Sequence, residues 1–297
     1  MNMQSSAALS IGLPVVLCIV MLGLGLSLKL DDFRRVLQQP QAVLIGLFCQ
    51  IIILPIICYG LTYASGLPPA IAVGMMLLAA SPGGTSATLY THLARGDVAL
   101  SITLTALTSV LSIVMVPFIA NFALARFYGE ASAVYLELSL VAQIFVIAVV
   151  PAMIGVLVQS RYPVLARRLD RPVKLLATLF LAAIVIFALV SQWGLVVTWG
   201  VTILTVVLPF NLMSLAVGYL VPRLFRIEYR QAIALAMSIG VHNAALVIAI
   251  ALSEQMLNNP EMAIPPAAYG LLAYITSGVL VWVVNRRQAV AAKRSPD

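Results

Sequence analysis

The feature that most limits what this chain can fold into is a series of apolar segments, each close to 20 residues long. A helix needs about 20 residues to cross the hydrocarbon core of a bilayer. Charged residues make up only 9% of the chain, whereas a soluble domain carries about 25%. The sequence therefore predicts an all-α polytopic membrane protein with about nine transmembrane helices, at about residues 8–28, 40–65, 68–93, 98–122, 134–158, 174–192, 196–221, 230–253 and 264–284.

The basic residues predict how these helices are oriented. Sixteen of the 17 lysines and arginines lie in alternate loops or in the carboxyl-terminal tail, and Arg126 is the one that lies on the opposite side. By the positive-inside rule, the amino terminus is outside and the carboxyl terminus is cytoplasmic, in a multi-pass protein of a bacterial-type inner membrane. This topology accounts for the net charge of +7, so no nucleic-acid partner is expected.

No linker or low-complexity stretch divides the chain, and residues 1–297 are predicted to form a single transmembrane domain. The longest polar stretch, 159–174, separates four spans from five. We therefore expect a first repeat at about 8–122 and a second at about 134–284. The three cysteines have no metal-ligand spacing, and we interpret them as small buried apolar residues.

The third span contains a break that a transmembrane helix should avoid. In LLAASPGGTSATLYTHLARGD (77–97), Pro82, Gly83 and Gly84 follow one another and a polar stretch begins. Proline and glycine weaken or end helices. Backbone groups freed in this way are tolerated in a bilayer only where protein or a water-filled cavity satisfies them. The run therefore predicts a discontinuous helix that lines a cavity.

The eighth span contains a second break, in ALAMSIGVHNAALVIAIAL (234–252). Gly240, His242 and Asn243 lie in the middle of an otherwise apolar helix, where an unpartnered polar side chain costs about 1–3 kcal/mol. One interpretation is a pair of interhelical hydrogen bonds with a glycine for close packing. The other is a second discontinuous helix.

The positions of the two breaks favour the second interpretation. Each break lies one span before the end of its half, and the two halves have opposite predicted orientations. Paired breaks of this kind indicate an inverted-repeat secondary transporter with a binding site near the membrane midplane. The free N–H ends of the broken helices suit an anionic substrate, and the free C=O ends suit a cation.

Several motifs resemble those of the bile acid:sodium symporter family over about residues 11–285. They are SPGGTSATLYTHLARGDVALSITLTALTSVLSIVMVP, MLGLGLSLKLDDF, QQPQAVLIGLFCQIIILPI and MSIGVHNAAL. The resemblance implies two crossed discontinuous helices in a core domain, here spans two to four and seven to nine, and a panel domain, here spans one, five and six. It also implies transport of an organic anion, such as a bile-acid-like or pantoate-like carboxylate or a short keto acid.

The resemblance also implies a set of sodium ligands. Gln50, Ser101 and Thr105 match ligands of the sodium-coupled members. Where the family motif supplies serine and asparagine after Pro-Gly-Gly-Thr-Ala, this chain offers only the hydroxyl of Thr88.

The second break departs further from the family pattern Glu-Val-Gly-Met-Gln-Asn. The chain has Ser238-Ile239-Gly240-Val241-His242-Asn243 at the corresponding place, so serine replaces the glutamate that serves both sodium sites and histidine replaces the glutamine. Without that carboxylate, attraction for a buried cation falls by several kcal/mol. The change argues against two-sodium coupling.

Four residues are the predicted substrate contacts. Thr85 and Ser86 start the second half of the third span, where hydroxyl and N–H groups meet the expected cavity. His242 and Asn243 occupy the equivalent place in the other break. His242 is the only histidine at membrane depth, and it either carries a proton or holds the substrate anion. The alternative is a neutral histidine that only hydrogen-bonds across the crossover.

Three functions follow. The first is secondary active transport of a small organic anion by alternating access. The second keeps the fold but replaces sodium with proton symport through His242 or with facilitated diffusion. The third is a membrane sensor or scaffold that binds without translocation. An enzyme is not expected, because the spans hold no carboxylate pair and no metal-ligand cluster. Beyond a coupling sodium ion or proton, no cofactor is expected, and the sequence leaves the oligomeric state open.

Overall fold

Six of the predicted spans lie in the part of the chain that the computed structural model describes. The description is continuous over residues 38–84, 86–129, 193–253 and 256–294, with separate positions within 18–26 and 150–190. The predicted spans at 8–28, 134–158 and 174–192, which would form the panel, lie largely outside the described residues.

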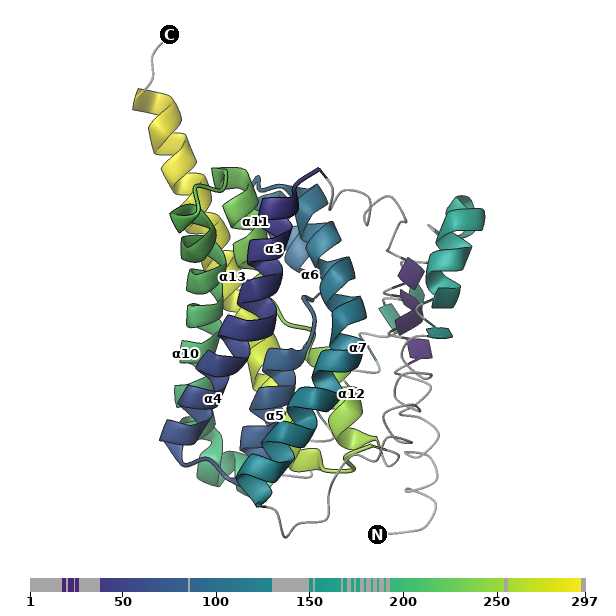
Figure 1. Ribbon diagram of the computed structural model, residues 1–297, viewed down its shortest axis with the longest axis vertical. Helices are drawn as coiled ribbons and strands as arrows, with labels where there is room; N and C mark the ends of the chain where they lie inside the picture. Colours follow the sequence, from purple (N-terminus) through teal and green to yellow (C-terminus); the bar gives the residue numbers. More distant parts are fainter. Residues whose placement is uncertain are drawn as a thin grey trace.

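The described helices form a bundle whose axes run mainly along its long dimension (Figure 1). No strand occurs in the described residues. The elements are α3 (Pro40–Phe48), η2 (Cys49–Ile53), α4 (Leu54–Ser65), α5 (Pro69–Ala80), α6 (Ser86–Leu93), α7 (Val98–Tyr128), α10 (Trp193–Leu224), α11 (Tyr229–Gly240), α12 (Ala244–Leu252), η3 (Pro260–Ala263) and α13 (Ile264–Arg294).

Several of these helices are long and apolar enough to cross a membrane. Pro40–Ser65, Val197–Leu224 and Pro260–Gln288 each do so as one helical stretch. Helix α7 also does so if its two parts, bent by 55° between Ser112 and Val114, form one span. The bend lies four residues before Pro117, which cannot donate the hydrogen bond that a helix needs there. The molecule is thus a helical membrane protein.

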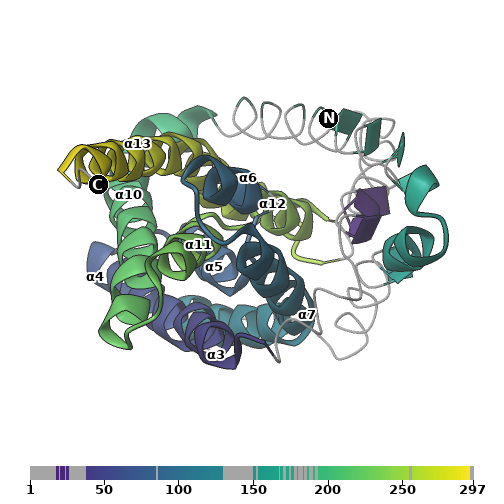
Figure 2. The same cartoon turned by 90° about the horizontal axis from the view of Figure 1, so that it is seen from above.

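Helices α5 and α11 occupy the centre of the bundle, and Figure 2 shows the longer helices arranged around them. Every residue of α5 from Ala70 to Ala80 is buried, as is every residue of α11 from Ala232 to Gly240. A helix that is apolar on all sides is stable only when other elements surround it. The central position of these two helices satisfies that requirement.

Both predicted breaks are present. Helix α5 ends at Ala80 and α6 begins at Ser86, while α11 ends at Gly240 and α12 begins at Ala244. The two connecting segments meet, and Gly83 and His242 form an antiparallel bridge. Two interrupted helices therefore cross at their interruptions.

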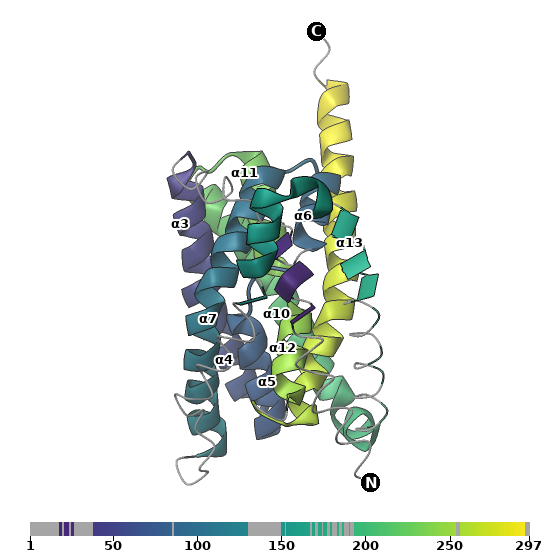
Figure 3. The same cartoon turned by 90° about the vertical axis from the view of Figure 1, so that its right-hand side faces the viewer.

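Basic loops from the two halves lie together at one end of the bundle. The Asp97 N–H donates to the Arg230 carbonyl at 2.9 Å, and Arg230 Nε donates to the Arg95 carbonyl at 3.2 Å. Helix α13 extends past this end of the bundle toward the carboxyl terminus (Figures 1 and 3). The residues that the charge pattern assigns to one side of the membrane are thus neighbours.

Candidate functional site at the helix crossover

The crossover is held by direct contacts between the two backbones. The Gly84 N–H donates to the Val241 carbonyl at 2.6 Å, and the Asn243 N–H donates to the Pro82 carbonyl at 2.9 Å. These four groups belong to no helix and lie in buried residues, so they would be unsatisfied without one another. Each break therefore supplies the hydrogen-bond partners of the other.

Glycine is required on the first segment because the partner backbone lies so close. A Cβ atom at Gly83 would stand 2.9 Å from the Ser238 carbonyl oxygen, and one at Gly84 would stand 3.0 Å from the His242 carbonyl oxygen. Both distances are shorter than a normal carbon–oxygen contact. The Pro-Gly-Gly run thus ends α5 and also makes room for the other segment.

The side chain of Asn243 defines the start of α12. Its Oδ1 accepts a hydrogen bond from the Leu246 N–H at 3.1 Å, as expected of an N-cap residue. This bond fixes the orientation of the amide and leaves Nδ2 as the group that can meet a ligand. No described residue accepts a hydrogen bond from this Nδ2. Asn243 therefore offers a donor, which suits an acceptor or an anion.

Gln50, Ser81 and His242 form a polar cluster on one side of the crossover. Gln50 Nε2 donates to the Ser81 carbonyl at 3.0 Å and lies 3.3 Å from His242 Nδ1. Ser81 Oγ donates to the Leu78 carbonyl at 2.7 Å. All three residues are buried. This cluster satisfies the carbonyl of Ser81, the first residue after α5.

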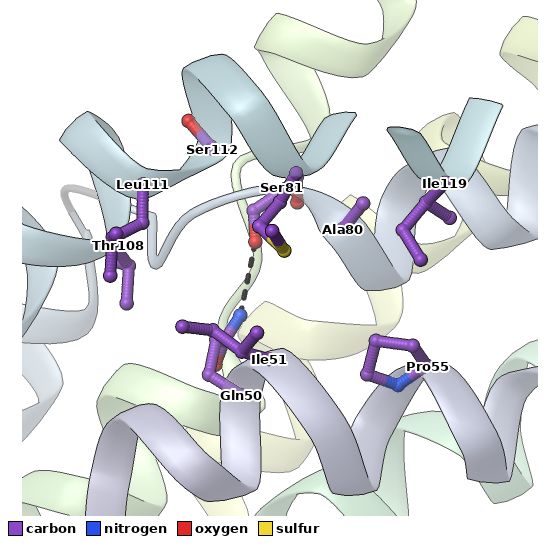
Figure 4. Close-up of a pocket in the computed structure, with 10 residues that line it drawn as sticks. Gln50, Ile51, Pro55, Ala80, Ser81, Thr108, Leu111, Ser112 and Ile119 are labelled. Atoms are coloured by element: carbon purple, nitrogen blue, oxygen red, sulfur yellow. Dashed lines mark hydrogen bonds between the residues drawn. The ribbon is translucent and has the colours of Figure 1, made fainter. Parts of the chain in front are cut away.

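The helix that carries Gln50 is distorted at that residue. Gln50 lies in η2, a five-residue π-helical turn between α3 and α4. Such turns often occur at functional sites, because the extra residue changes which way the side chains face. Figure 4 shows Gln50 pointing from this helix toward Ser81, beside a small pocket between α4, α5 and α7 whose partly polar lining includes Gln50, Ser81, Thr108 and Ser112.

The ring of His242 is enclosed by aromatic side chains. It stacks on Phe210 with centroids 5.6 Å apart and meets Tyr269 edge-on at 5.3 Å. Its Nε2 is buried and has no hydrogen-bond partner among the described residues. Between the rings and the cluster with Gln50, the imidazole has a single well-defined orientation.

A second polar cluster lies near Gly83 and joins the crossover to α7. The hydroxyl groups of Ser101 and Ser238 are hydrogen-bonded at 2.9 Å. The Gly83 N–H donates to Thr108 Oγ1 at 3.3 Å. Thr105 Oγ1 is buried and, in the described part of the chain, has no partner. This cluster contains hydroxyl groups but no carboxylate.

The residues predicted as sodium ligands fall into these two clusters rather than one. Gln50 and His242 belong to the first, and Ser101, Thr105 and Ser238 belong to the second. Two further predicted sodium ligands, Val241 and Ile239, lie in or beside the second break. The Val241 carbonyl already accepts a hydrogen bond from the Gly84 N–H, and Ile239 is fully buried just before the end of α11. Thr88 lies on α6, and no hydrogen bond links it to either cluster in the described residues.

Of the predicted substrate contacts, three are described. Ser86 is the first residue of α6, while His242 and Asn243 lie in the second break. Thr85 lies outside the described residues. The sequence interpretation missed Ser81, Asn211 and Tyr269. Asn211 is fully buried within the apolar helix α10, and a polar residue at that depth was the signal that could have identified it.

Acidic side chains are distant from the crossover in the described part of the chain. Asp97 and Glu228 are the residues before α7 and α11 at one end of the bundle, and Glu261 lies in η3. No group of three or more histidine, cysteine, aspartate or glutamate residues with metal-binding geometry occurs among the described residues. The polar groups of the crossover are therefore uncharged side chains and backbone.

Comparison with known proteins shows which family the chain resembles. The model of the Sodium Bile acid symporter family matches residues 14–199, more than half of the chain. The uncharacterized sodium-dependent transporter YocS of Bacillus subtilis (strain 168) is 27% identical over 285 residues, which cover 95% of this chain and 86% of the relative.

Two further relatives are longer than this chain. The probable sodium/metabolite cotransporter BASS1, chloroplastic, of Arabidopsis thaliana is 26% identical over 92% of this chain and 66% of its own length. The ileal sodium/bile acid cotransporter of Oryctolagus cuniculus is 26% identical over 54% of this chain and 46% of its own length. These relatives are described as transporters rather than enzymes. The chain therefore belongs to the Sodium Bile acid symporter family.

Proposed function

We propose that this member of the family is a secondary active transporter that carries a small organic anion across the membrane by alternating access. The observation that carries the proposal is the crossing of two interrupted helices at Gly83 and His242. An interruption at membrane depth is stable only where protein or an aqueous cavity satisfies the backbone. In secondary transporters, such an arrangement is where substrate binds.

The balance of partial charges at the crossover favours an anion. The carbonyl ends of the broken helices already have internal donors, because Gln50 donates to Ser81 and both Asn211 and Tyr269 donate to Gly240. The amino-terminal ends of α6 and α12 begin at the same crossing. In the described residues, no carboxylate lies there to neutralise them. Helix amino termini with free donors bind anions such as carboxylates.

The proposed contacts are Ser86, His242 and Asn243, together with Thr85 from the sequence interpretation. Asn243 is the best supported of them, since its cap to Leu246 leaves the Nδ2 donor for the ligand. A carboxylate that accepts from this amide and from helix N–H groups gains charge-assisted hydrogen bonds. Bile-acid-like, pantoate-like and short keto acids are the first substrates to test.

Sodium coupling is the first candidate for the driving force. The relatives from Bacillus subtilis and Arabidopsis thaliana are described as a sodium-dependent transporter and a sodium/metabolite cotransporter. Gln50, Ser101 and Thr105 provide oxygen atoms, and those of Gln50 and Thr105 have no partner in the described residues. Oxygen ligands are what a hard cation such as sodium requires.

A sodium-independent carrier, proton-coupled or uncoupled, is the second candidate, and one observation favours it. One of the proposed sodium ligands, Ser101, is already hydrogen-bonded to Ser238, the residue that replaces the family's glutamate. A neutral hydrogen bond therefore occupies an oxygen atom that a cation would need, and no carboxylate accompanies it.

We further propose that the chain is an inverted repeat of four and five spans in an inner membrane, with its amino terminus outside and its carboxyl terminus cytoplasmic. The close approach of the loops that carry Arg95 and Arg230 supports this orientation, because basic loops are retained on the cytoplasmic side. The described core helices would move relative to a panel formed by the remaining spans.

The experiment is uptake of labelled organic anions by proteoliposomes under a sodium, potassium or proton gradient. Sodium symport predicts uptake only with sodium, and Ser238→Glu should then strengthen the sodium dependence. Uptake that is unaffected by replacing sodium with potassium supports the second candidate. Binding of an anion without any uptake would replace both proposals with a sensor or scaffold. Ser277→Ala is the control, since it removes a buried hydroxyl on α13 that has no partner among the described residues.

A further inference from the structure

We propose that Arg126, Tyr59 and Tyr63 form a binding site for the phosphate of a membrane phospholipid, whose acyl chains lie along exposed apolar side chains of α4 and α7. The site is separate from the crossover, and the inference goes beyond the proposed function without depending on it. Arg126 is the basic residue that the charge pattern leaves on the opposite side of the membrane from the other 16. The positive-inside rule gives no reason for a basic residue there.

The guanidinium of Arg126 is held in place by two tyrosines of another helix. Its Nε donates to Tyr59 Oη at 2.9 Å, and its central carbon lies 4.9 Å from the centre of the Tyr63 ring. The two tyrosine rings stack on each other with centroids 5.9 Å apart. These contacts restrict an exposed side chain that otherwise has many rotamers. The cation therefore has a defined position between α4 and α7.

The remaining edge of this guanidinium suits a phosphate. Since Nε is bound to Tyr59, the donors of Nη1 and Nη2 are left for other partners, and Arg126 is exposed. In the described part of the chain, the groups that act on Arg126 are the two tyrosines, and no carboxylate is among them. A planar guanidinium can bind phosphate through two parallel hydrogen bonds. Because the side chain is already ordered, little entropy is lost on binding.

The cluster lies near the ends of two helices that are long and apolar enough to cross the membrane. Helix α4 ends at Ser65 and α7 ends at Tyr128, and both ends lie at the end of the bundle opposite the projecting part of α13 (Figure 1). Phe122 and Phe127 pack around Tyr59, with ring centroids 5.6 and 6.1 Å away. Aromatic residues gather at the level of the lipid headgroups. We therefore place the guanidinium at that level.

Exposed apolar side chains of α7 lead along the helix to Arg126. Val114, Phe118 and Phe122 are between 46% and 67% exposed. They precede Arg126 at intervals of four residues, so all four side chains lie on one side of the helix. An acyl chain that follows this row ends beside the guanidinium.

Helix α4 offers a second row beside the first. Ile56 and Tyr63 are exposed, and between them a Cβ atom at Gly60 would meet nothing within 4 Å. The three residues are spaced by four and three positions, which again places them on one side of the helix. Because Arg126 contacts Tyr63, the rows of the two helices end at the same cation.

The two parts of this surface match the two parts of a phospholipid. An apolar surface alone would contact any acyl chain of the bilayer, and a cation alone would attract any anion. Here a fixed guanidinium stands at the headgroup end of two apolar rows. A phosphodiester that carries acyl chains satisfies both parts at once, whereas a soluble anion satisfies only the cation.

Native mass spectrometry of the full-length protein in detergent tests the site. The protein is titrated with dioleoylphosphatidylglycerol, dioleoylphosphatidylethanolamine and dioleoylglycerol, which carry the same acyl chains, and the last of them lacks the phosphate. We expect the first molecule of either phospholipid to bind about tenfold more tightly than dioleoylglycerol, as a charge-assisted hydrogen bond would allow. Arg126→Gln should abolish this difference.

Two further variants separate the site from net charge. Arg126→Lys keeps the charge but loses the planar fork and the Nε contact with Tyr59, so most of the phospholipid preference should also be lost. Arg226→Gln is the matched control, because Arg226 is an exposed arginine at the other end of the bundle, and it should leave the preference unchanged.

Three results would overturn the proposal. The first is a phospholipid preference that persists in Arg126→Gln, and the second is an equal loss in Arg226→Gln, which would assign the preference to net charge. The third is displacement of the phospholipid by an equal concentration of glycerol 3-phosphate, which would show that the site takes a soluble anion. None of these measurements requires transport, so they stand whether or not the protein takes up an organic anion.

Discussion

The two breaks that meet at the crossover are built in different ways. The first consists of proline and two glycines, and it contributes backbone and close approach. The second contributes side chains, because His242 and Asn243 supply the imidazole and the helix cap. Its glycine serves packing instead, since a Cβ atom at Gly240 would stand 2.2 Å from Leu215 Cδ2. The first break leaves space for the partner backbone, and the second places polar groups at the crossover.

This difference between the two breaks predicts where substitutions affect stability and where they affect transport. Changes in the first break should act through steric overlap of two backbones. Changes in the second should separate into effects on the helix cap and effects on the ligand. Four sets of variants test this comparison, and the expected loss of stability falls from the steric overlap at Gly83 to the hydroxyl of Ser81.

The largest loss of stability is expected for Gly83→Ala. Its Cβ atom would lie 2.9 Å from the Ser238 carbonyl, and the crossed segments would have to separate. Overpacking of this kind costs about 1–3 kcal/mol, which a thermal unfolding curve in detergent detects. Gly278→Ala on α13 is the matched control, because nothing lies within 4 Å of its Cβ position. Equal melting temperatures for the two variants would contradict the steric role of Gly83.

Two substitutions of Asn243 distinguish its role as a helix cap from its proposed contact with the ligand. Asn243→Ala removes the acceptor for the Leu246 N–H and should cost about 1 kcal/mol of stability. Asn243→Asp keeps an acceptor there but replaces the Nδ2 donor with an oxygen. We therefore expect Asp to restore the melting temperature while uptake of the anion stays low. If Asp restores uptake as well, the amide is only a cap.

The pair Ser101 and Ser238 tests how the second break is tied to α7. Each single change to alanine removes one partner of a buried hydrogen bond and should cost about 1 kcal/mol. The double variant should cost little more than either single variant, because the same bond is lost. Melting temperatures of the four proteins measure this coupling. Additive losses would mean that the 2.9 Å contact contributes nothing to stability.

The smallest effect is expected for Ser81→Ala, in the break that is made of backbone. The Ser81 hydroxyl donates only to Leu78, and the Ser81 N–H already donates to the same carbonyl. Its distance of 3.5 Å to His242 Nδ1 is at the limit for a hydrogen bond. We expect Ser81→Ala to lower the free energy of unfolding by less than about 0.5 kcal/mol, as measured by thermal unfolding. A loss as large as that of Asn243→Ala would remove the distinction between the two breaks.

The positions of the breaks could be predicted from sequence because their causes are local. Pro82 with Gly83 and Gly84 ends a helix wherever it occurs, and the polar residues around His242 stand out in an apolar span. The described helices that are long and apolar enough to cross a membrane likewise follow from runs of apolar residues. The geometry of each break, however, depends on the other one, since Gly84 and Asn243 find their acceptors in the opposite half of the chain.

The partners of the site could not be predicted in the same way. Gln50 reaches Ser81 and His242 from a π-helical turn, and an apolar pattern does not reveal a shift of backbone hydrogen bonds by one residue. Asn211 and Tyr269 come from helices 29 residues away on either side of Gly240. Their role depends on how α10 and α13 pack against α11, which is decided by tertiary contacts.

The antiparallel bridge at the crossover has a consequence for hydrogen exchange. The amides of Gly84 and Asn243 lie in non-helical segments, where amide protons normally exchange quickly with solvent. Here both donate to buried carbonyls of the other segment, so neither can open unless the two segments separate. Their protons should exchange together and as slowly as those in the middle of α5 and α11. Two peptide groups outside any helix would then report on the most stable part of the molecule.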